Sequence, residues 1–245
     1  MEKETNIYGI RAILEAIEAD KSIDKLFIQR GLQGTLIKSL ETVSRKKGIN
    51  TVYVPVEKLD RLTPHNHQGA VAMISPIEFA NFEELVNKVI ETKETPLFLL
   101  LDSLSDVRNF GAIIRTASCT GVDGIIIPKK GAAPVTADTI KTSAGAAFNV
   151  PIAKVDHLKD AVYYLQGSGV TVIAATEKAD GLIYDKDLKQ PLAIIMGSED
   201  VGIAPALLKL ADLQAKLPME GSIASLNVSV ACSVFLYEAL RQRIS

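Results

Sequence analysis

The chain has 245 residues, of which 47% are hydrophobic and 23% charged, as is typical of a globular protein with one large or two modest domains. No apolar run approaches the roughly 20 residues that a membrane helix needs, which excludes a spanning segment. The charged first residues, Met1–Thr5, do not resemble a signal peptide, so we expect a cytoplasmic protein.

The formal net charge of −2 neither predicts nor excludes a nucleic-acid partner. Residues 1–76 contain 11 Lys and Arg against 9 Asp and Glu, whereas residues 77–245 contain 16 against 20. Phosphate contacts would have to come from local clusters such as Arg45-Lys46-Lys47 and Lys129-Lys130. On sequence alone, such clusters more often belong to a solvated helix face or loop.

Cysteine and histidine residues give no sign of a disulfide or a metal site. Cys119 and Cys232 both lie in apolar helical patterns, which favours two reduced thiols in the core. His65, His67 and His157 lack the spacing of metal ligands, and we expect no metal.

Residues 1–76 predict a small α/β unit. In chain order we expect a helix at 10–17, a strand at 25–28, a helix at 35–47 ended by Gly48, a strand at 51–54, a short helix at 56–62 and a strand at 70–74. Residues 77–95 form a linker with one charged helix at 82–91.

Residues 96–245 predict a second unit built from longer βα repeats. The continuous apolar run Leu97–Leu101 is typical of a strand buried on both faces of a parallel sheet. Similar strands are expected at 124–128, 170–175 and 192–196, with helices at 113–120 and 227–243. This alternation predicts an α/β fold with a parallel sheet between helices, whose ligands bind at the carboxyl ends of the strands.

The first loop at such a strand end, residues 102–111, leads into the helix that carries Arg115. Asp106 or Asn109 is a suitable N-cap for this helix. Arg115 lies among apolar residues, so we expect it to be partly buried and to need acceptors. The sequence leaves a structural ion pair and a functional role equally open.

The second loop follows the strand that ends at Met196. Gly197 allows a close backbone approach to a ligand, and Glu199 and Asp200 place two carboxylates at the strand end. A tight turn with acidic residues at a helix start explains the same pattern. No P-loop lysine follows, and the dinucleotide pattern G-x-G-x-x-G is absent from the sequence.

In the third loop, a strand ends at Leu217 and a helix begins within residues 225–227. Ser225 or Asn227 caps the helix, and together with Ser229 they surround its N-terminus with short polar groups suited to an anion or polar ligand. Three polar loops at one edge of a parallel sheet predict a ligand site there.

These three loops resemble the motifs of the SpoU branch of the SPOUT RNA methyltransferases, and the chain is similar throughout to the RlmB/TrmH-type 2'-O-methyltransferases. The longest match comprises Leu217-Pro218-Met219, Ser225-Leu226-Asn227-Val228-Ser229-Val230-Ala231, Leu236-Tyr237-Glu238 and Arg241-Gln242-Arg243. Met196-Gly197-Ser198-Glu199 resembles motif two, and Asn109-x-Gly111 with Arg115-Thr116-Ala117 resembles motif one. Residues 7–16 and 67–72 resemble the ends of the family's N-terminal substrate-binding domain, which is similar to RNA-binding ribosomal proteins.

The resemblance implies an RNA substrate-binding domain at 1–76, a linker at 77–95 and a methyltransferase domain at 96–245 whose C-terminal segment forms a trefoil knot. It implies that S-adenosylmethionine is held in the knotted region largely by backbone groups. It also implies a homodimer whose active site is completed at the subunit interface.

The resemblance assigns catalytic roles to Arg115, Asn109, Glu199, Ser225 and Asn227. It assigns cofactor contacts to Thr176, Met196, Gly197, Leu217, Met219 and Leu226. A guanidinium with a pKa above about 12 is a poor general base, so we interpret Arg115 as orienting the acceptor and stabilising alkoxide charge. Glu199 would hold Arg115 or receive the proton, the two asparagines would position ribose and loops, and Ser225 would order the site.

The sequence departs from the family pattern at two positions. Val107 follows Asp106 where the family usually has proline, and Asp200 stands where motif two usually has glycine. Neither change removes a reacting group, but both put the loop conformations in question.

The expected function is methyl transfer from S-adenosylmethionine to the ribose 2'-hydroxyl of an RNA nucleotide, with rRNA favoured over tRNA and a guanosine in large-subunit rRNA as the target. The alternatives are a tRNA 2'-O-methyltransferase and a non-catalytic RNA-binding ribosome assembly factor.

Overall fold

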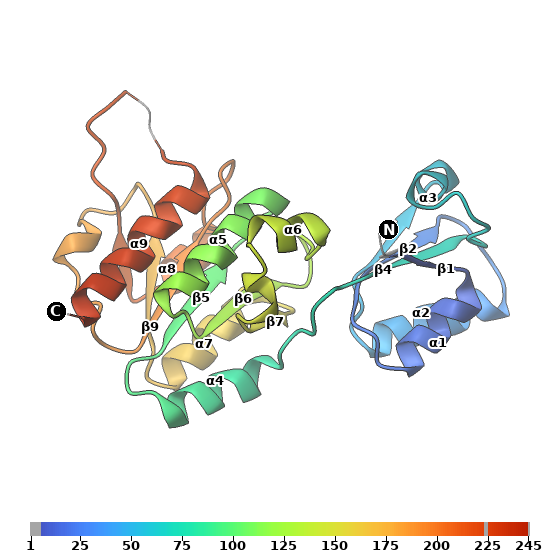
Figure 1. Cartoon of the computed structure of the whole chain (residues 1–245), viewed down its shortest axis with the longest axis horizontal. Coiled ribbons are helices and arrows are strands. Elements are labelled where there is room, and N and C mark those ends of the chain that lie inside the picture. The colour runs from blue at the N-terminus through green and yellow to red at the C-terminus, as the bar shows by residue number, and fades with distance from the viewer. Residues whose placement is uncertain (1–5, 223–224, 245) are drawn as a thin grey trace. The chain divides into compact units, whose positions relative to one another are not determined.

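The computed structural model describes residues 6–222 and 225–244, so the charged residues Met1–Thr5 lie outside it (Figure 1). The chain divides into two compact units. The first contains the described residues up to Glu78 together with Pro134–Thr136, and the second contains Phe79–Ala133 and the residues from Ala137 onward.

The first unit is a mixed four-stranded sheet with helices on both faces. Its elements are β1 (Asn6–Tyr8), α1 (Ile10–Glu18), β2 (Ile23–Gln29), α2 (Thr35–Lys46), β3 (Thr51–Val54), α3 (Val56–Leu62) and β4 (Ala70–Ile74). The strand order is β1-β4-β2-β3, with only the β2–β3 pair parallel. Side chains of α1 and α2 pack on one face of β2 through Leu26 and Ile28, and α3 packs on the other through Phe27.

The second unit is built on a parallel sheet of six strands in the order β10-β8-β9-β5-β6-β7. Its strands are β5 (Leu97–Leu101), β6 (Gly124–Pro128), β7 (Ile152–Val155), β8 (Thr171–Ala175), β9 (Leu192–Met196) and β10 (Leu213–Ala215). Its helices are α4 (Phe82–Thr92), α5 (Val107–Thr120), α6 (Ala137–Thr142), α7 (Leu158–Gly167), α8 (Pro205–Leu210) and α9 (Val228–Arg243), with 3-10 turns η1 (Ala146–Phe148) and η2 (Ile183–Asp185). The predicted α/β class is therefore confirmed.

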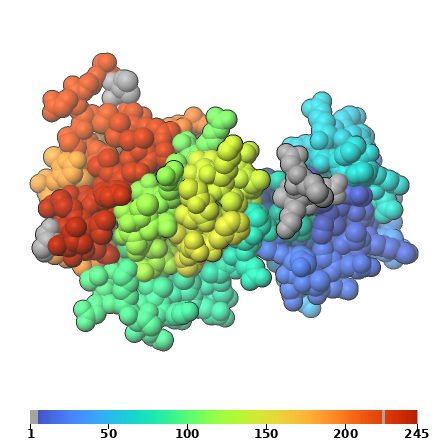
Figure 2. All heavy atoms as spheres, in the orientation of Figure 1, coloured from blue at the N-terminus to red at the C-terminus, as the bar shows by residue number. Residues whose placement is uncertain are grey.

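Helices form a layer on each face of this sheet. Helices α4, α7 and α8 pack on one face through the alternate strand residues that include Phe98 and Leu100, and α5 and α9 pack together on the other (Figure 1). All five residues of β5 and of β9 are buried, as the apolar runs predict. In Figure 2, the atoms of α9 (red) and α5 (green) lie side by side on an open face of this unit.

Some predicted boundaries were wrong. Helix α5 begins at Val107, six residues before the predicted start, because Asp106 is its N-cap and accepts a 2.7 Å bond from the backbone of Asn109. Gly111 inside this helix suggests a loop, yet a Cβ there would lie 2.7 Å from Thr142, so the glycine serves close packing. The strand before the third loop ends at Ala215, not Leu217.

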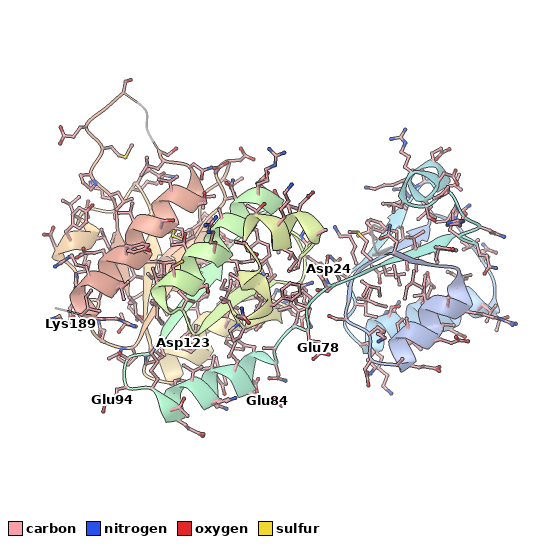
Figure 3. All side chains as sticks on the ribbon, in the orientation of Figure 1. Asp24, Glu78, Glu84, Glu94, Asp123 and Lys189 are labelled. Atoms are coloured by element: carbon pink, nitrogen blue, oxygen red, sulfur yellow. The ribbon has the colours of Figure 1, made fainter. Side chains whose placement is uncertain are left out.

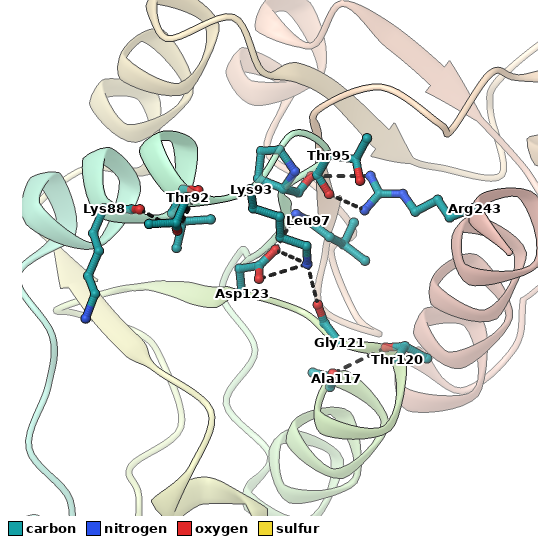
Figure 4. Close-up of polar contacts among 12 residues, drawn as sticks. Lys88, Thr92, Lys93, Thr95, Leu97, Ala117, Thr120, Gly121, Asp123 and Arg243 are labelled. Carbon is teal, nitrogen blue, oxygen red and sulfur yellow. Dashed lines mark hydrogen bonds and ion pairs between the residues drawn. The ribbon is translucent and has the colours of Figure 1, made fainter.

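Two polar side chains, those of Asp123 and Arg243, hold the amino end of the sheet in place. Asp123 turns inward, whereas Glu84 and Glu94 point away from the sheet (Figure 3). The carboxylate of Asp123 accepts from Leu97 N at 2.8 Å and forms an ion pair with Lys93 (Figure 4). The guanidinium of Arg243, the last residue of α9, donates to four backbone carbonyls, those of Thr95, Pro96, Leu188 and Gln190. This contact fixes the end of the last helix against the chain segments that lead into β5 and β9.

Candidate active site

A cavity of about 300 Å³ lies among the loops that follow β8, β9 and β10, at the carboxyl edge of the sheet. The six residues expected to contact the cofactor all line it, as do Glu199 and Ser225. The rest of the lining comprises Ala175, Glu177, Lys178, Ser198, Asp200, Val201, Gly202, Lys216, Val228, Ala231 and Phe235. Three of the lining side chains, those of Val201, Met219 and Leu226, are apolar and at least 40% exposed, so the cavity wall includes exposed apolar surface.

Gly197 begins a tight loop between β9 and α8. A Cβ at this position would lie 2.2 Å from the carbonyl carbon of Gly202 and 2.3 Å from the nitrogen of Ile203. Gly202 closes the loop by donating to the carbonyl of Ser198 at 2.9 Å. The close backbone approach predicted for Gly197 is therefore made by the loop itself, while the glycine also lines the cavity.

Asn227 is the N-cap of α9 and links three segments of the chain. Its carbonyl oxygen accepts from the backbone and hydroxyl of Ser229, at 3.0 and 2.6 Å. Its amide nitrogen donates to Asn109 at 3.1 Å and to Oε1 of Glu199. Of the two caps that the sequence allows, Asn227 is the one used, and Ser225 lies exposed in the cavity wall.

Glu199 lies at the N-terminus of α9. Its Oε1 also accepts from the backbone nitrogen of Val228, at 3.2 Å. An acidic group is favoured there because the free N–H groups of the first turn carry partial positive charge. Three of the five residues expected to be catalytic, Asn109, Glu199 and Asn227, thus form one hydrogen-bonded cluster at the cavity's edge.

Arg115 lies apart from this cluster and is exposed, so the prediction of partial burial was wrong. The buried residues of α5 include Phe110, Ile113, Ile114 and Ala117, which share one side of the helix. Successive residues are about 100° apart, so Arg115 points away from that side although its sequence neighbours are apolar. Within residues 6–222 and 225–244, its guanidinium makes no hydrogen bond or ion pair and does not line the cavity, and Glu199 does not hold it.

The same helical geometry corrects the expectation of two core thiols. Cys119 is exposed, because it falls on the outer side of α5, whereas Cys232 in α9 is buried. Burial raises the pKa of the Cys232 thiol to about 12.

Neither departure from the family motifs strains the backbone. Val107 is the first residue of α5, a position that proline favours but that needs no intrahelical N–H bond. Asp200 is not among the residues with positive φ, whereas Gly202 has φ of 72°. Valine and aspartate therefore occupy backbone conformations that both residue types adopt readily.

Sequence reasoning missed the charged residues on the β8 and β10 side of the cavity, Glu177, Lys178 and Lys216. The rule that pointed to the other three loops, polar residues just after a buried strand, also applies here, because residues 177 and 178 follow β8 closely. In the part of the chain that the structure describes, no three His, Cys, Asp or Glu side chains gather as metal ligands. No helix there is long and apolar enough to span a membrane.

A parallel sheet with a cavity and a polar cluster at its carboxyl edge is typical of an α/β protein that binds a small molecule at the ends of its strands. Residues 96–237 match the SpoU rRNA Methylase family, and residues 6–80 match the family described as RNA 2'-O ribose methyltransferase substrate binding. The chain therefore belongs to the SpoU rRNA methylase family, and it is an S-adenosylmethionine-dependent RNA 2'-O-ribose methyltransferase of the TrmH/SpoU type.

Relatives and solved structures match over nearly the whole chain. It is 34% identical over 237 residues to the putative TrmH family tRNA/rRNA methyltransferase YacO of Bacillus subtilis, covering 97% of this chain and 95% of that protein. A Staphylococcus aureus homologue is 37% identical over 242 residues, covering 98% and 97%. The SpoU methyltransferase AviRb of Streptomyces viridochromogenes, crystallised with the cofactor AdoMet, superimposes with a TM-score of 0.61 at 27% identity, over 98% of this chain and 90% of AviRb.

The cavity fits this cofactor in charge and polarity. Glu177, Glu199 and Asp200 against Lys178 and Lys216 give the lining a formal charge of −1. S-adenosylmethionine carries a sulfonium, an ammonium and a carboxylate, which sum to +1. The exposed apolar side chains in the wall suit its adenine ring, and Thr176 and the loop backbones offer polar partners for its ribose.

Proposed function

We propose that the enzyme methylates a guanosine of large-subunit rRNA, with the cofactor bound in the cavity after β8, β9 and β10. The observation that carries the site assignment is that all six expected cofactor residues meet in this one wall, beside the Asn109–Glu199–Asn227 cluster. Support for rRNA comes from the family match and from coverage: the tRNA-modifying TrmH/SpoU enzyme of A. aeolicus aligns with only 66% of this chain, at 28% identity and a TM-score of 0.57. We expect the protein to act in the cytoplasm, where this RNA is made in bacteria such as those of its relatives.

When bound, S-adenosylmethionine supplies an electrophilic methyl group on its sulfonium. The backbone around Gly197, Leu217 and Leu226 would hold it, with Thr176, Met196 and Met219 beside it. Asn109 accepts from Asn227 through its Oδ1 and would present its amide N–H groups to the ribose. Asn227, whose side-chain amide is fully bonded to Asn109, Glu199 and Ser229, would position the loops. Ser225 would order the wall of the site.

Arg115 would orient the acceptor nucleotide and stabilise the charge that develops on its oxygen. It is exposed and outside the cavity of its own chain, so we propose that it acts in the site of a partner in a homodimer. The outer side of α9 supports this arrangement, since Val230 and Tyr237 are 49% and 53% exposed although the opposite side of the helix is buried. Exposed apolar side chains that gather on one face of a helix are typical of a surface that another protein chain covers. We also propose that the C-terminal segment of the methyltransferase domain forms a trefoil knot.

Two experiments test these assignments. Mapping 2'-O-methylation in a strain that lacks the gene should show that one guanosine of large-subunit rRNA loses its 2'-O-methyl group. Loss of a methyl group from tRNA instead would establish the tRNA alternative. Arg115→Ala should abolish methyl transfer but still bind S-adenosylmethionine in calorimetry; full activity would remove Arg115 from the mechanism, and absence of cofactor binding by the native protein would support the assembly-factor alternative.

Mixing two inactive variants tests the shared site. If Arg115 serves the partner's cavity, Arg115→Ala and Asn227→Ala subunits co-refolded in equal amounts should recover about a quarter of native activity, because half of the dimers then hold one intact site. The same variants mixed without subunit exchange are the control. No recovery in exchanged dimers would assign Arg115 to its own chain.

A further inference from the structure

Asp102 is a buried carboxylate at the carboxyl end of β5. It is 8% exposed, and within the described residues it has no ion pair. Its backbone nitrogen donates to the carbonyl of Met196 at 2.8 Å. Its Oδ2 accepts from the backbone nitrogen of Ala204 at 2.7 Å, and its Oδ1 accepts from the hydroxyl of Ser103 at 3.1 Å.

A carboxylate without a cation is costly in such a place unless strong hydrogen bonds replace its water. The bond to Ala204 joins residues 102 positions apart in the chain. Ala204 is the N-cap residue of α8 and has no capping side chain of its own. Asp102 therefore supplies an acceptor from β5 at the point where the loop ends and α8 begins.

The loop between β9 and α8 is thus fixed at both ends from β5. Met196 holds its start through the sheet, and the Asp102–Ala204 bond holds its end. Between them, Gly202 bonds back to Ser198, so the loop has little freedom of its own. This loop contributes Gly197 to the cavity wall and presents Glu199 to the N-terminus of α9.

We propose that Asp102 is a positioning residue of the methyltransferase: it holds the β9–α8 loop in the conformation that receives the cofactor. The inference rests on the proposed placement of S-adenosylmethionine in this cavity. Asp102 does not itself line the cavity, and its carboxylate bonds only Ala204 and Ser103, which do not line it either, so the effect of this side chain on the site passes through Ala204.

The test compares Asp102 with Asp123, a matched carboxylate at the other end of the same sheet that accepts from Leu97 N at 2.8 Å. Asp102→Ala should raise the Kd of S-adenosylmethionine, measured by calorimetry without RNA, by about ten-fold or more. Asp102→Asn should raise it less, because an amide oxygen still accepts from Ala204, in a weaker neutral bond. Asp123→Ala should lower the melting temperature without changing the Kd.

Hydrogen exchange in the cofactor-free protein gives a readout independent of activity. Amides at 197–204 should exchange faster in both Asp102 variants, most in Asp102→Ala, while those of β5 and β9 stay protected. If Asp102→Ala does not fold, Asp102→Asn carries the test through the same two measurements. Unchanged exchange, or faster exchange with an unchanged Kd, overturns the proposal. Failure of the native protein to bind the cofactor would instead refute the placement of the cofactor site.

Discussion

Replacing Gly197 with alanine adds one methyl group where the loop already has backbone. The new Cβ would lie 2.2 to 2.5 Å from the carbonyl group of Gly202 and the nitrogen of Ile203. Carbon atoms in favourable contact are about 3.5–4.0 Å apart, so backbone atoms must move by more than about 1 Å. The loop cannot yield freely, because Met196 and Ala204 hold its ends.

Overpacking of this kind costs about 1–3 kcal/mol, and we expect the upper end because only backbone can move. For a domain of this size, about 3 kcal/mol corresponds to a melting temperature lower by about 6–12 °C. The Kd of S-adenosylmethionine should rise as well, since the opened loop forms the wall of the cavity. Thermal unfolding and calorimetry measure the two effects separately.

Gly167→Ala is the matched control. Gly167 ends α7 with no atom near its absent Cβ, so alanine should be neutral or stabilise by up to about 1 kcal/mol. A Gly197→Ala protein that melts within about 2–4 °C of the native one, the size of the control's effect, would refute the steric reasoning.

Three further predictions concern α9 and its neighbours. Arg243→Ala should destabilise the second unit by about 2–4 kcal/mol in urea unfolding, because four carbonyls lose a charged donor. Arg243→Lys should lower the free energy of unfolding by less, and equal stability of all three proteins would contradict this reasoning. A thiol reagent should label one cysteine per native chain, Cys119, and two in urea, because Cys232 is buried with a pKa raised to about 12; native labelling of a Cys119→Ser variant would count against it. The bonds from Arg241 lower the pKa of Glu238 from its ordinary 4.5, so the stability it adds is present above pH 4.5 and lost as pH falls through the lower folded pKa. The stability gap between native protein and Glu238→Gln should therefore close on acidification, and a gap constant from pH 7 to about 3 would exclude the contribution.

The sequence was sufficient where a feature depends on residues close together in the chain. Five consecutive apolar residues predicted β5 and β9, because a strand buried on both faces leaves no place for alternation. The sequence also indicated Asn227 as one of two possible N-caps of α9, because the bond from its oxygen reaches only two residues ahead, but it did not decide between Asn227 and Ser225. The resemblance to the family added the residues of the cavity wall, which no periodicity could have gathered.

What the sequence could not supply are contacts between distant segments. Asn109 meets Asn227 across 118 positions, and Asp102 meets Ala204 across 102. The exposure of Arg115 was misjudged because apolar neighbours in sequence were taken as neighbours in space. On a helix, each residue points about 100° away from the next, so the residues before and after Arg115 point in directions about 200° apart. Which of these directions is buried depends on how α5 packs on the sheet.

The hydrogen bonds of Glu199 bear on whether it fixes the site or receives the proton of the acceptor. Its Oε1 already accepts from the amide of Asn227 and the backbone of Val228, so this oxygen is committed to holding the start of α9. Asn227 in turn holds Asn109 at the start of α5, and Asp102 sets the loop from which Glu199 projects. The cluster therefore joins three loops that leave the sheet at β5, β9 and β10, and Arg115 on the outer side of α5 is free to serve a second surface. A carboxylate used in this way is better suited to fixing the site before RNA arrives than to carrying a proton away from it.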